Sequence, residues 1–133
     1  KPIHVFNDVH AMLAFVGAGR LDRAAAHLSM LEARAGGGGR HGAMLRRLGV
    51  PVARALLVFG RGQWAAAARE LERAMADEQL MTGSRAQRDV LVMTLIEATL
   101  RAGERQGALR LLRPRAAAKP ASARIERDLA RCG

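Results

Sequence analysis

The sequence predicts an all-α protein in which antiparallel helix hairpins stack into a short right-handed α-solenoid. Half of the 133 residues are apolar but only 3% are aromatic, so Ala, Leu and Met must fill the interior, as they do between closely packed helices. β-branched residues are sparse, which disfavours a sheet. One pattern of glycine, alanine and leucine also occurs three times along the chain, which indicates repeated units.

Caps, apolar periodicity and glycines place the helices of the N-terminal half. Asn7 and Asp8 are good N-caps for a first helix that runs to about Val16. A second helix is predicted over 21–35, because its apolar residues recur at intervals of three and four. Gly36–Gly39 ends it. A third helix begins near Pro51, which suits a first helical turn, and ends at Gly60.

The C-terminal half contains four more predicted helices. The first starts at Gln63 or Trp64 and runs to Met75, and Thr82–Ser84 separates it from the next, over 86–101. In the latter, four residues are expected to face inward: Val90, Leu91, Leu95 and Ala98. Another spans 106–113 before Pro114 perturbs it, and Lys119–Pro120 ends that segment. A last helix over 122–131 is expected to cap the stack.

The repeated pattern lies at the turn between the two helices of each hairpin. A glycine precedes an alanine by five residues and a leucine by nine: Gly19, Ala24 and Leu28; Gly62, Ala67 and Leu71; Gly103, Ala108 and Leu112. The glycines are 43 and 41 residues apart, against about 34 in a tetratricopeptide repeat. We therefore expect tetratricopeptide-like units with long helices and loops over residues 6–40, 49–82 and 84–120, followed by a capping helix over 121–132.

Four segments resemble the C-terminal third of tetratricopeptide repeat protein 38 and its bacterial relatives, in the same order and at the same spacing. They are Phe6–His10, Arg46–Pro51, Gly83–Val90 and Lys119–Arg131. The run AQRDV, which opens the fifth helix, is the most specific, although Thr82 and Arg85, on either side of Gly83–Ser84 just before it, depart from the family pattern. The resemblance implies a helical-repeat fold and further repeats upstream of Lys1. It implies no biochemical activity.

Charge and cysteine content bear on partners and compartment. The net charge is +10, and 101–133 alone contains nine basic and three acidic residues, so a polyanion stays among the candidate partners. Cys132 is the only cysteine, which fits a reducing compartment. With no signal peptide visible and no apolar run long enough for a bilayer, the expected location is the cytoplasm. Because the chain begins with Lys1, we expect a piece of a longer polypeptide.

The best candidate binding residues occur in two clusters, Asn7, Asp8 and His10 in the first and Gln87, Arg88 and Asp89 in the second. Each cluster opens the first helix of a hairpin, and such helices line the concave surface of a right-handed stack. An arginine there pairs well with a partner's carboxylate. In the alternative interpretation, Asp8 and Asp89 cap helices while Arg88 bridges neighbouring repeats.

Other chemistry finds little support in the sequence. The four histidines have no metal-binding spacing, and Gly36–Arg40 lacks the lysine and hydroxyl residue of a phosphate loop. No serine lies in a sequence context typical of a catalytic nucleophile, and no pair of residues can be identified as a general acid and a general base. We therefore expect no metal, no cofactor and no intrinsic catalysis.

The sequence thus predicts a scaffold that binds a protein or peptide partner through a concave helical surface. Two alternatives stay open: a polyanion or nucleic-acid binder that uses the basic C-terminal third, and a structural end piece of an enzyme whose active site lies upstream. We also expect self-association through Val5, Phe6 and Leu13, because a first hairpin without upstream repeats would leave its apolar side uncovered.

Overall fold

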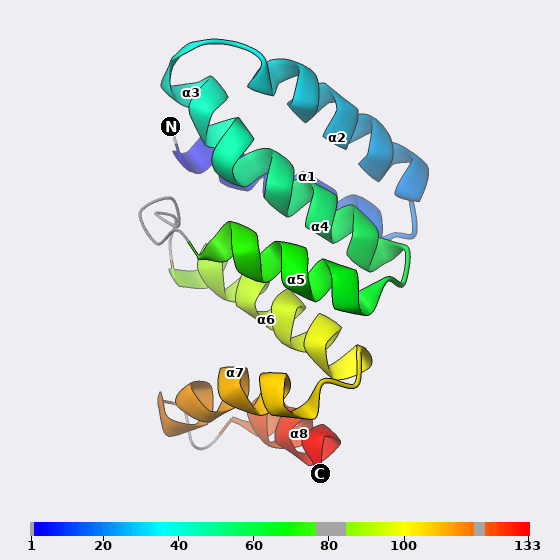
Figure 1. The fold of residues 1–133 in the computed structure, drawn as a ribbon, viewed down its shortest axis with the longest axis vertical. Helices are drawn as coiled ribbons and strands as arrows, with labels where there is room; N and C mark the ends of the chain where they lie inside the picture. The colour runs from blue at the N-terminus through cyan, green and yellow to red at the C-terminus, as the bar shows by residue number, and fades with distance from the viewer. Residues whose placement is uncertain (1, 77–84, 119–121) are drawn as a thin grey trace.

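The computed structural model describes residues 2–76, 85–118 and 122–133, and every regular element in this part of the chain is helical (Figure 1). The elements form an elongated stack with α2 at one end and α7 and α8 at the other. They are α1 (Pro2–Gly17), α2 (Leu21–Ala35), α3 (Gly39–Met44), the π-helical turn η1 (Leu45–Gly49), α4 (Val50–Gly60), α5 (Trp64–Met75), α6 (Arg85–Arg101), α7 (Arg105–Ala118) and α8 (Ala123–Cys132). The all-α class is confirmed. The predicted connectors Thr82–Ser84 and Lys119–Pro120 lie outside the described residues.

The three glycine turns predicted from the repeated pattern are present and alike. Gly19, Gly62 and Gly103 have φ angles of 73°, 79° and 76°, a left-handed conformation that costs other residues about 1–2 kcal/mol. At each turn the glycine N–H donates to the carbonyl three residues back, and the next N–H donates to the carbonyl five residues back. These two bonds form the Schellman motif that closes a helix C-terminus. The alanines five residues after the glycines are all buried.

Replacing Gly103 with alanine tests how much the left-handed turn contributes. A Cβ at Gly103 would meet nothing within 4 Å, so the substitution adds strain at φ without a steric clash. We expect the free energy of unfolding of Gly103→Ala to fall by about 1–2 kcal/mol, measured by urea denaturation. Gly17→Ala is the matched control, because a Cβ there also meets nothing and its φ is not positive. Equal midpoints for the two variants would contradict the prediction.

The helix predicted to begin near Pro51 is α4, which is the last part of a longer helical segment. α3, η1 and α4 follow each other without a break from Gly39 to Gly60. Within a regular α-helix, Pro51 would clash with the carbonyl of residue 47 and leave it without a donor. The π turn over Leu45–Gly49 widens the helix just before the proline, and Val50 N–H donates to the carbonyl of Leu45, five residues back. Pro51 therefore lies in the first turn of α4, as predicted, and the π turn before it lets α3 and α4 join without a break.

The larger hydrophobic core lies among α1, α2, η1, α4 and α5, and one face of α6 closes it. α4 is its centre: it packs against α1, α2 and α5, and its Val52, Ala53, Ala55 and Leu56 are at most 1% exposed. The turns of the first two hairpins also approach closely. A Cβ on Gly60 would lie 2.7 Å from Leu21 Cδ2 and 3.1 Å from Val16 Cγ1, so any other residue here would have to displace the Leu21 side chain.

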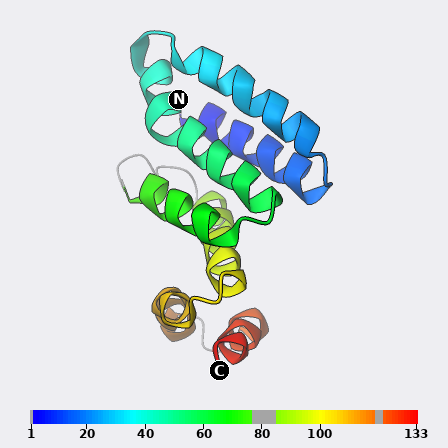
Figure 2. The ribbon, with the colours of Figure 1, turned by 45° about the vertical axis from the view of Figure 1, so that its right-hand side comes forward.

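Helix α6 belongs to two cores because it is apolar on more than one side. Leu91, Leu95 and Ala98 face the larger core. Ile96 faces a smaller cluster with Ala108 and Leu112 of α7 and Ile125 and Cys132 of α8. A helix that is apolar nearly all round is usually buried on several sides. Figure 2 shows the result: α7 and α8 form a pair below α6, and Leu111 of α7 also packs against the larger core.

Several predictions about local structure were wrong. Asn7 and Asp8 do not cap α1, because the helix begins at Pro2 and already includes both residues. α7 continues through Pro114 to Ala118; the proline is exposed, so water can solvate the carbonyl that its missing N–H leaves unpaired. Val90 was expected to face inward but is 36% exposed.

The surface predicted for self-association is largely inside the protein. Phe6 is 1% exposed and belongs to the larger core, and Leu13 is half-buried against the same core. The side chain of Val5 lies outside the described part of the structure. The prediction required Phe6 to lie on an exposed apolar face of α1. Phe6 is buried instead, and Asn7, His10 and Ala14 are exposed on this helix, at intervals of three and four.

Candidate functional site

The first predicted cluster joins the two helices of the first hairpin. Asp8 Oδ1 lies 3.2 Å from Nε2 of His27 on α2, and both side chains are largely buried. The His27 ring also makes an edge contact with Phe15, at 6.0 Å between centroids. Asp8 thus has a structural partner, while Asn7 and His10 are exposed on α1. The idea that Asp8 caps a helix is wrong, and the side chain joins α1 to α2 instead.

The second predicted cluster lies elsewhere in the stack. Gln87, Arg88 and Asp89 are in the first turns of α6, and α4 and α5 lie between α6 and α1 (Figure 1). The two clusters are therefore not adjacent. Asp89 accepts from both Nη atoms of Arg115 on α7, at 2.9 and 3.3 Å. Arg88 is exposed, and the arginine that pairs with Asp89 is Arg115, so this contact joins the two helices of the third hairpin.

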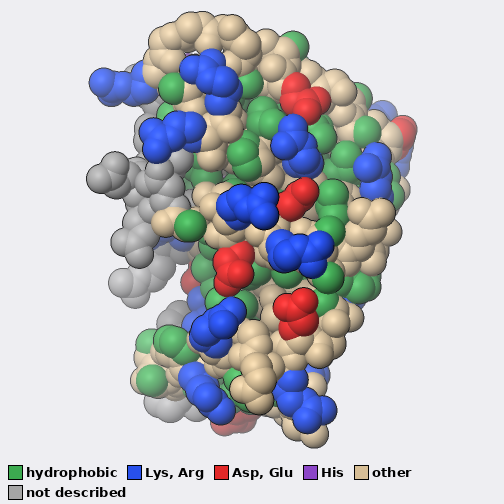
Figure 3. Space-filling model, in the orientation of Figure 1, with side chains coloured by type: hydrophobic (Ala, Val, Ile, Leu, Met, Phe, Trp, Pro, Cys, Tyr) green, Lys and Arg blue, Asp and Glu red, His purple; other side chains and the backbone are tan. Residues whose placement is uncertain are grey.

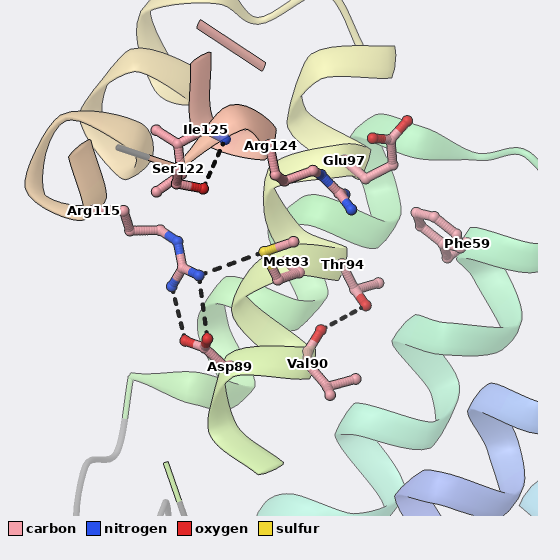
Figure 4. Close-up of a pocket in the computed structure, with 10 residues that line it drawn as sticks. All are labelled: Phe59, Asp89, Val90, Met93, Thr94, Glu97, Arg115, Ser122, Arg124 and Ile125. Atoms are coloured by element: carbon pink, nitrogen blue, oxygen red, sulfur yellow. Dashed lines mark hydrogen bonds and ion pairs between the residues drawn. The ribbon is translucent and has the colours of Figure 1, made fainter. Parts of the chain in front are cut away.

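Asp89 stands at one wall of a groove of about 640 Å³, to which α4, α6, α7 and α8 contribute (Figure 4). This volume is within the range of typical ligand sites. α6 supplies the floor with residues at positions i, i+3, i+4 and i+7. The groove is lined by Phe59, Asp89, Val90, Met93, Thr94, Glu97, Arg115, Ser122, Arg124 and Ile125.

The middle of the groove is apolar and open to solvent. Val90 is the exposed large hydrophobic residue of the described chain, and Met93 follows it one turn later on α6. Phe59, at the end of α4, and Ile125, on α8, stand on either side. Methionine adapts its shape readily to different apolar partners. The groove can therefore bury an apolar side chain that another molecule brings.

Two supports fix the wall formed by α4. The Phe59 ring meets Trp64 edge-on at 5.0 Å between centroids, with an interplanar angle of 75°. On Trp64, the Arg101 guanidinium carbon lies 4.7 Å from the ring centroid, a cation–π contact. Phe59 is thus held from behind by the single tryptophan, which also makes Trp64 emission a reporter on the groove.

An ion-pair network links α6 to α8 at the other end of the groove. Glu97 Oε1 and Oε2 accept from Arg131 at 2.8 and 3.0 Å, and Oε2 also accepts from Arg101 at 2.6 Å. The hydrogen bond from Arg131 and then that from Arg101 hold the pKa of Glu97 at about 2, against the opposing effect of burial. In turn, the hydrogen bond with Glu97 raises the pKa of Arg131. On α8 itself, buried Asp128 accepts from Arg124 at 3.3 Å.

This network predicts how stability depends on pH. Because the folded-state pKa of Glu97 is lowered from 4.5 to about 2, its contribution is present above pH 4.5 and is lost as the pH falls from about 4.5 towards 2. After allowance for solvent screening we expect Glu97→Gln to cost about 1–2 kcal/mol at neutral pH and almost nothing near pH 2. Urea denaturation across this pH range measures the difference. The control is Glu104→Gln, at an exposed position; a Glu97→Gln effect that does not change with pH would contradict the assignment.

The basic residues of the C-terminal third are mostly paired. Arg101, Arg115, Arg124 and Arg131 make the contacts described above, and Arg110 reaches Glu72 of α5 at 3.8 Å. Arg105, Arg113 and Arg127 are exposed and have no ion pair with any residue that the structure describes. On the face shown in Figure 3, acidic side chains lie between the basic ones. No continuous positive surface is visible on this face.

Most groove residues could not be identified from the sequence. Phe59 and Val90 read as core residues, and Arg115 and Arg124 as parts of a solvated basic face. One signal was available: Val90, Met93, Thr94 and Glu97 form a third stripe on α6, besides the two stripes that face the cores. A helix with three such stripes has more apolar surface than two neighbouring helices cover.

Comparisons of the chain with protein-family models, with curated proteins and with solved structures find no match. None of the helices in residues 2–76, 85–118 and 122–133 combines the length and apolarity needed to span a membrane. Among the same residues, no three histidine, cysteine or acidic side chains gather as a metal ion would require.

Proposed function

We propose that this protein is a tetratricopeptide-like α-solenoid of the tetratricopeptide repeat protein 38 family, from a bacterium, and that it acts as a cytoplasmic scaffold without catalysis of its own. Its partner is a protein segment that binds in the groove between α4 and α8. One observation carries this proposal: the groove has an apolar floor at which Val90 is 36% exposed. Exposed apolar surface with a polar rim marks interaction sites on soluble proteins.

The arrangement of the hairpins supports the family assignment. Three Schellman turns with left-handed glycines recur at the spacing of the sequence repeat, and each is followed by a buried alanine and leucine. α4 and α6, which open the second and third hairpins, both contribute to the groove, as expected for the concave side of such a stack. The contacts of Asp8 with His27 and of Asp89 with Arg115 within the protein argue against the two predicted clusters as the recognition surface.

Selection from a random short-peptide phage library tests the proposal and requires no identified partner. We expect the wild-type protein to enrich peptides that Val90→Glu binds at least about tenfold more weakly, because the peptide's apolar side chain would then be buried against a charge. Ala26→Glu, at an exposed position on α2 outside the groove, is the control and should bind like wild type. Peptides that bind Val90→Glu and wild type equally, or no enriched peptides at all, would argue against the groove as the binding site.

A further inference from the structure

The hydrogen-bonding groups of the groove are unequally used. Both oxygens of Asp89 accept from Arg115, and both oxygens of Glu97 accept from Arg131. These two carboxylates are the acidic groups of the lining, and ion pairs within the protein already occupy them. A ligand that offered only donors would have to compete with these bonds.

The donors of the two lining arginines are only partly used. Arg124 gives its Nε–H to Asp128 at 3.3 Å, whereas its Nη atoms have no acceptor in the described part of the chain. Its side chain is 47% exposed, and Figure 4 shows the guanidinium extended over the groove towards Glu97. On the opposite wall, Nε of Arg115 is buried and has no acceptor among the described residues. The charged side chains of the groove therefore have free hydrogen-bond donors, while their acceptors are already paired.

An unpaired buried donor has lost its hydration before any ligand arrives. Nε of Arg115 is such a donor, while both Nη atoms of the same guanidinium are paired with Asp89. Arg124 needs no rearrangement, because its free Nη atoms already face the groove. The two arginines stand at the edge of the apolar floor around Val90 and Met93. A ligand that satisfies all four side chains must combine an acceptor, best an anionic one, with an apolar group.

We propose that the occupant is a protein segment that sets an apolar side chain against Val90 and Met93 and a neighbouring carboxylate against Arg124. The carboxylate is the side chain of an aspartate or glutamate of that segment. This inference rests on the proposed function and narrows its partner to one chemical class.

Charge argues against two other occupants. A second copy of this chain would bring a net charge of +10 towards the arginines, so like charges would oppose its docking. A nucleic acid would place a series of phosphates beside Asp89 and Glu97, and Phe59 is the one aromatic ring in the lining. Single strands are usually held by several stacked aromatics along a positive groove. A single carboxylate next to an apolar group fits the lining better.

Synthetic versions of the selected peptides test the inference by fluorescence anisotropy. Each peptide is prepared with its acidic side chains, with these changed to the corresponding amides, and with a free or an amidated C-terminus, which shows whether a terminal carboxylate is used instead. We expect removal of the side-chain carboxylate to weaken binding to wild type about tenfold, as for one charge-assisted hydrogen bond. Against Arg124→Gln the same change should have little effect. Arg127→Gln, on the same helix but outside the groove, should behave like wild type.

The outcomes separate this inference from the proposed function. Peptides that depend on Val90 but bind equally well without a side-chain carboxylate, or equally well to Arg124→Gln, would overturn the inference and leave the scaffold proposal standing. The absence of any Val90-dependent peptide would overturn both. A fluorescent oligo-dT that competes with the peptides, and that Arg124→Gln binds more weakly, would overturn the inference in favour of a nucleic acid.

Discussion

Phe6→Ala is expected to lower the free energy of unfolding by about 3–5 kcal/mol. Phe6 is 1% exposed and is among the largest fully buried side chains, so truncation removes its transfer free energy and leaves a cavity among α1, η1 and α4. Such a loss is a large share of the stability of a domain of this size. Urea denaturation followed by circular dichroism measures it.

The matched control for this substitution is His10→Ala on the same helix. His10 is exposed, and surface substitutions away from special features usually stay within about 0.5 kcal/mol. A Phe6→Ala protein as stable as wild type, with a weakened tendency to self-associate, would instead restore Phe6 to the surface role that the sequence suggested. The pair of variants thus decides between a core residue and an interface residue.

Leu95→Ala and Ile96→Ala are expected to destabilise different parts of the molecule although they are neighbours in the chain. Leu95 is 5% exposed and packs in the larger core, whereas Ile96 is 1% exposed and packs against α7 and α8. Each truncation should cost about 2–4 kcal/mol. In Ile96→Ala, we expect the amides of α7 and α8 to lose protection from hydrogen exchange while those of α4 and α5 keep it. In Leu95→Ala, protection should fall in α4 and α5.

Native-state hydrogen exchange at single-residue resolution distinguishes the two variants. Identical protection patterns in both would show that the two clusters unfold as one cooperative unit, against the division inferred from their packing. Thr94→Ala serves as a control, because Thr94 lies between the two stripes, faces the groove and donates its hydroxyl to its own helix, to the carbonyl of Val90. Its loss should leave the exchange of α7 and α8 unchanged.

Local chemistry explains which parts of the fold could be predicted from the sequence. The turn glycines at 19, 62 and 103 were found because a left-handed C-terminal residue is almost always glycine, and the alanine that follows is set by close packing in the same hairpin. The starts of helices were harder to predict from the sequence. Asn7 and Asp8 read as caps, yet the chain is helical from Pro2, since the packing of α1 against α2 and α4 overrides a local preference.

The groove was beyond sequence reasoning for a different reason. Arg115 lies 26 residues from Asp89, and Arg131 lies 34 residues from Glu97, so no spacing along one helix relates the partners. Which arginines face a groove, and which face solvent, depends on how α7 and α8 pack against α6. Asp89 alone of the six predicted binding residues lines the groove, and it does so as the partner of an arginine that the sequence did not single out.

The position of the groove has a mechanical consequence. Phe59, on one side, belongs to the larger core, while Ile125, on the other, belongs to the smaller one. α6 is the floor between them and the helix that both cores share. A ligand that draws the two sides together must tilt one packing unit against the other about α6. The width of the groove and the angle between the two cores at α6 should therefore change together, so the proposed partner would also fix that angle.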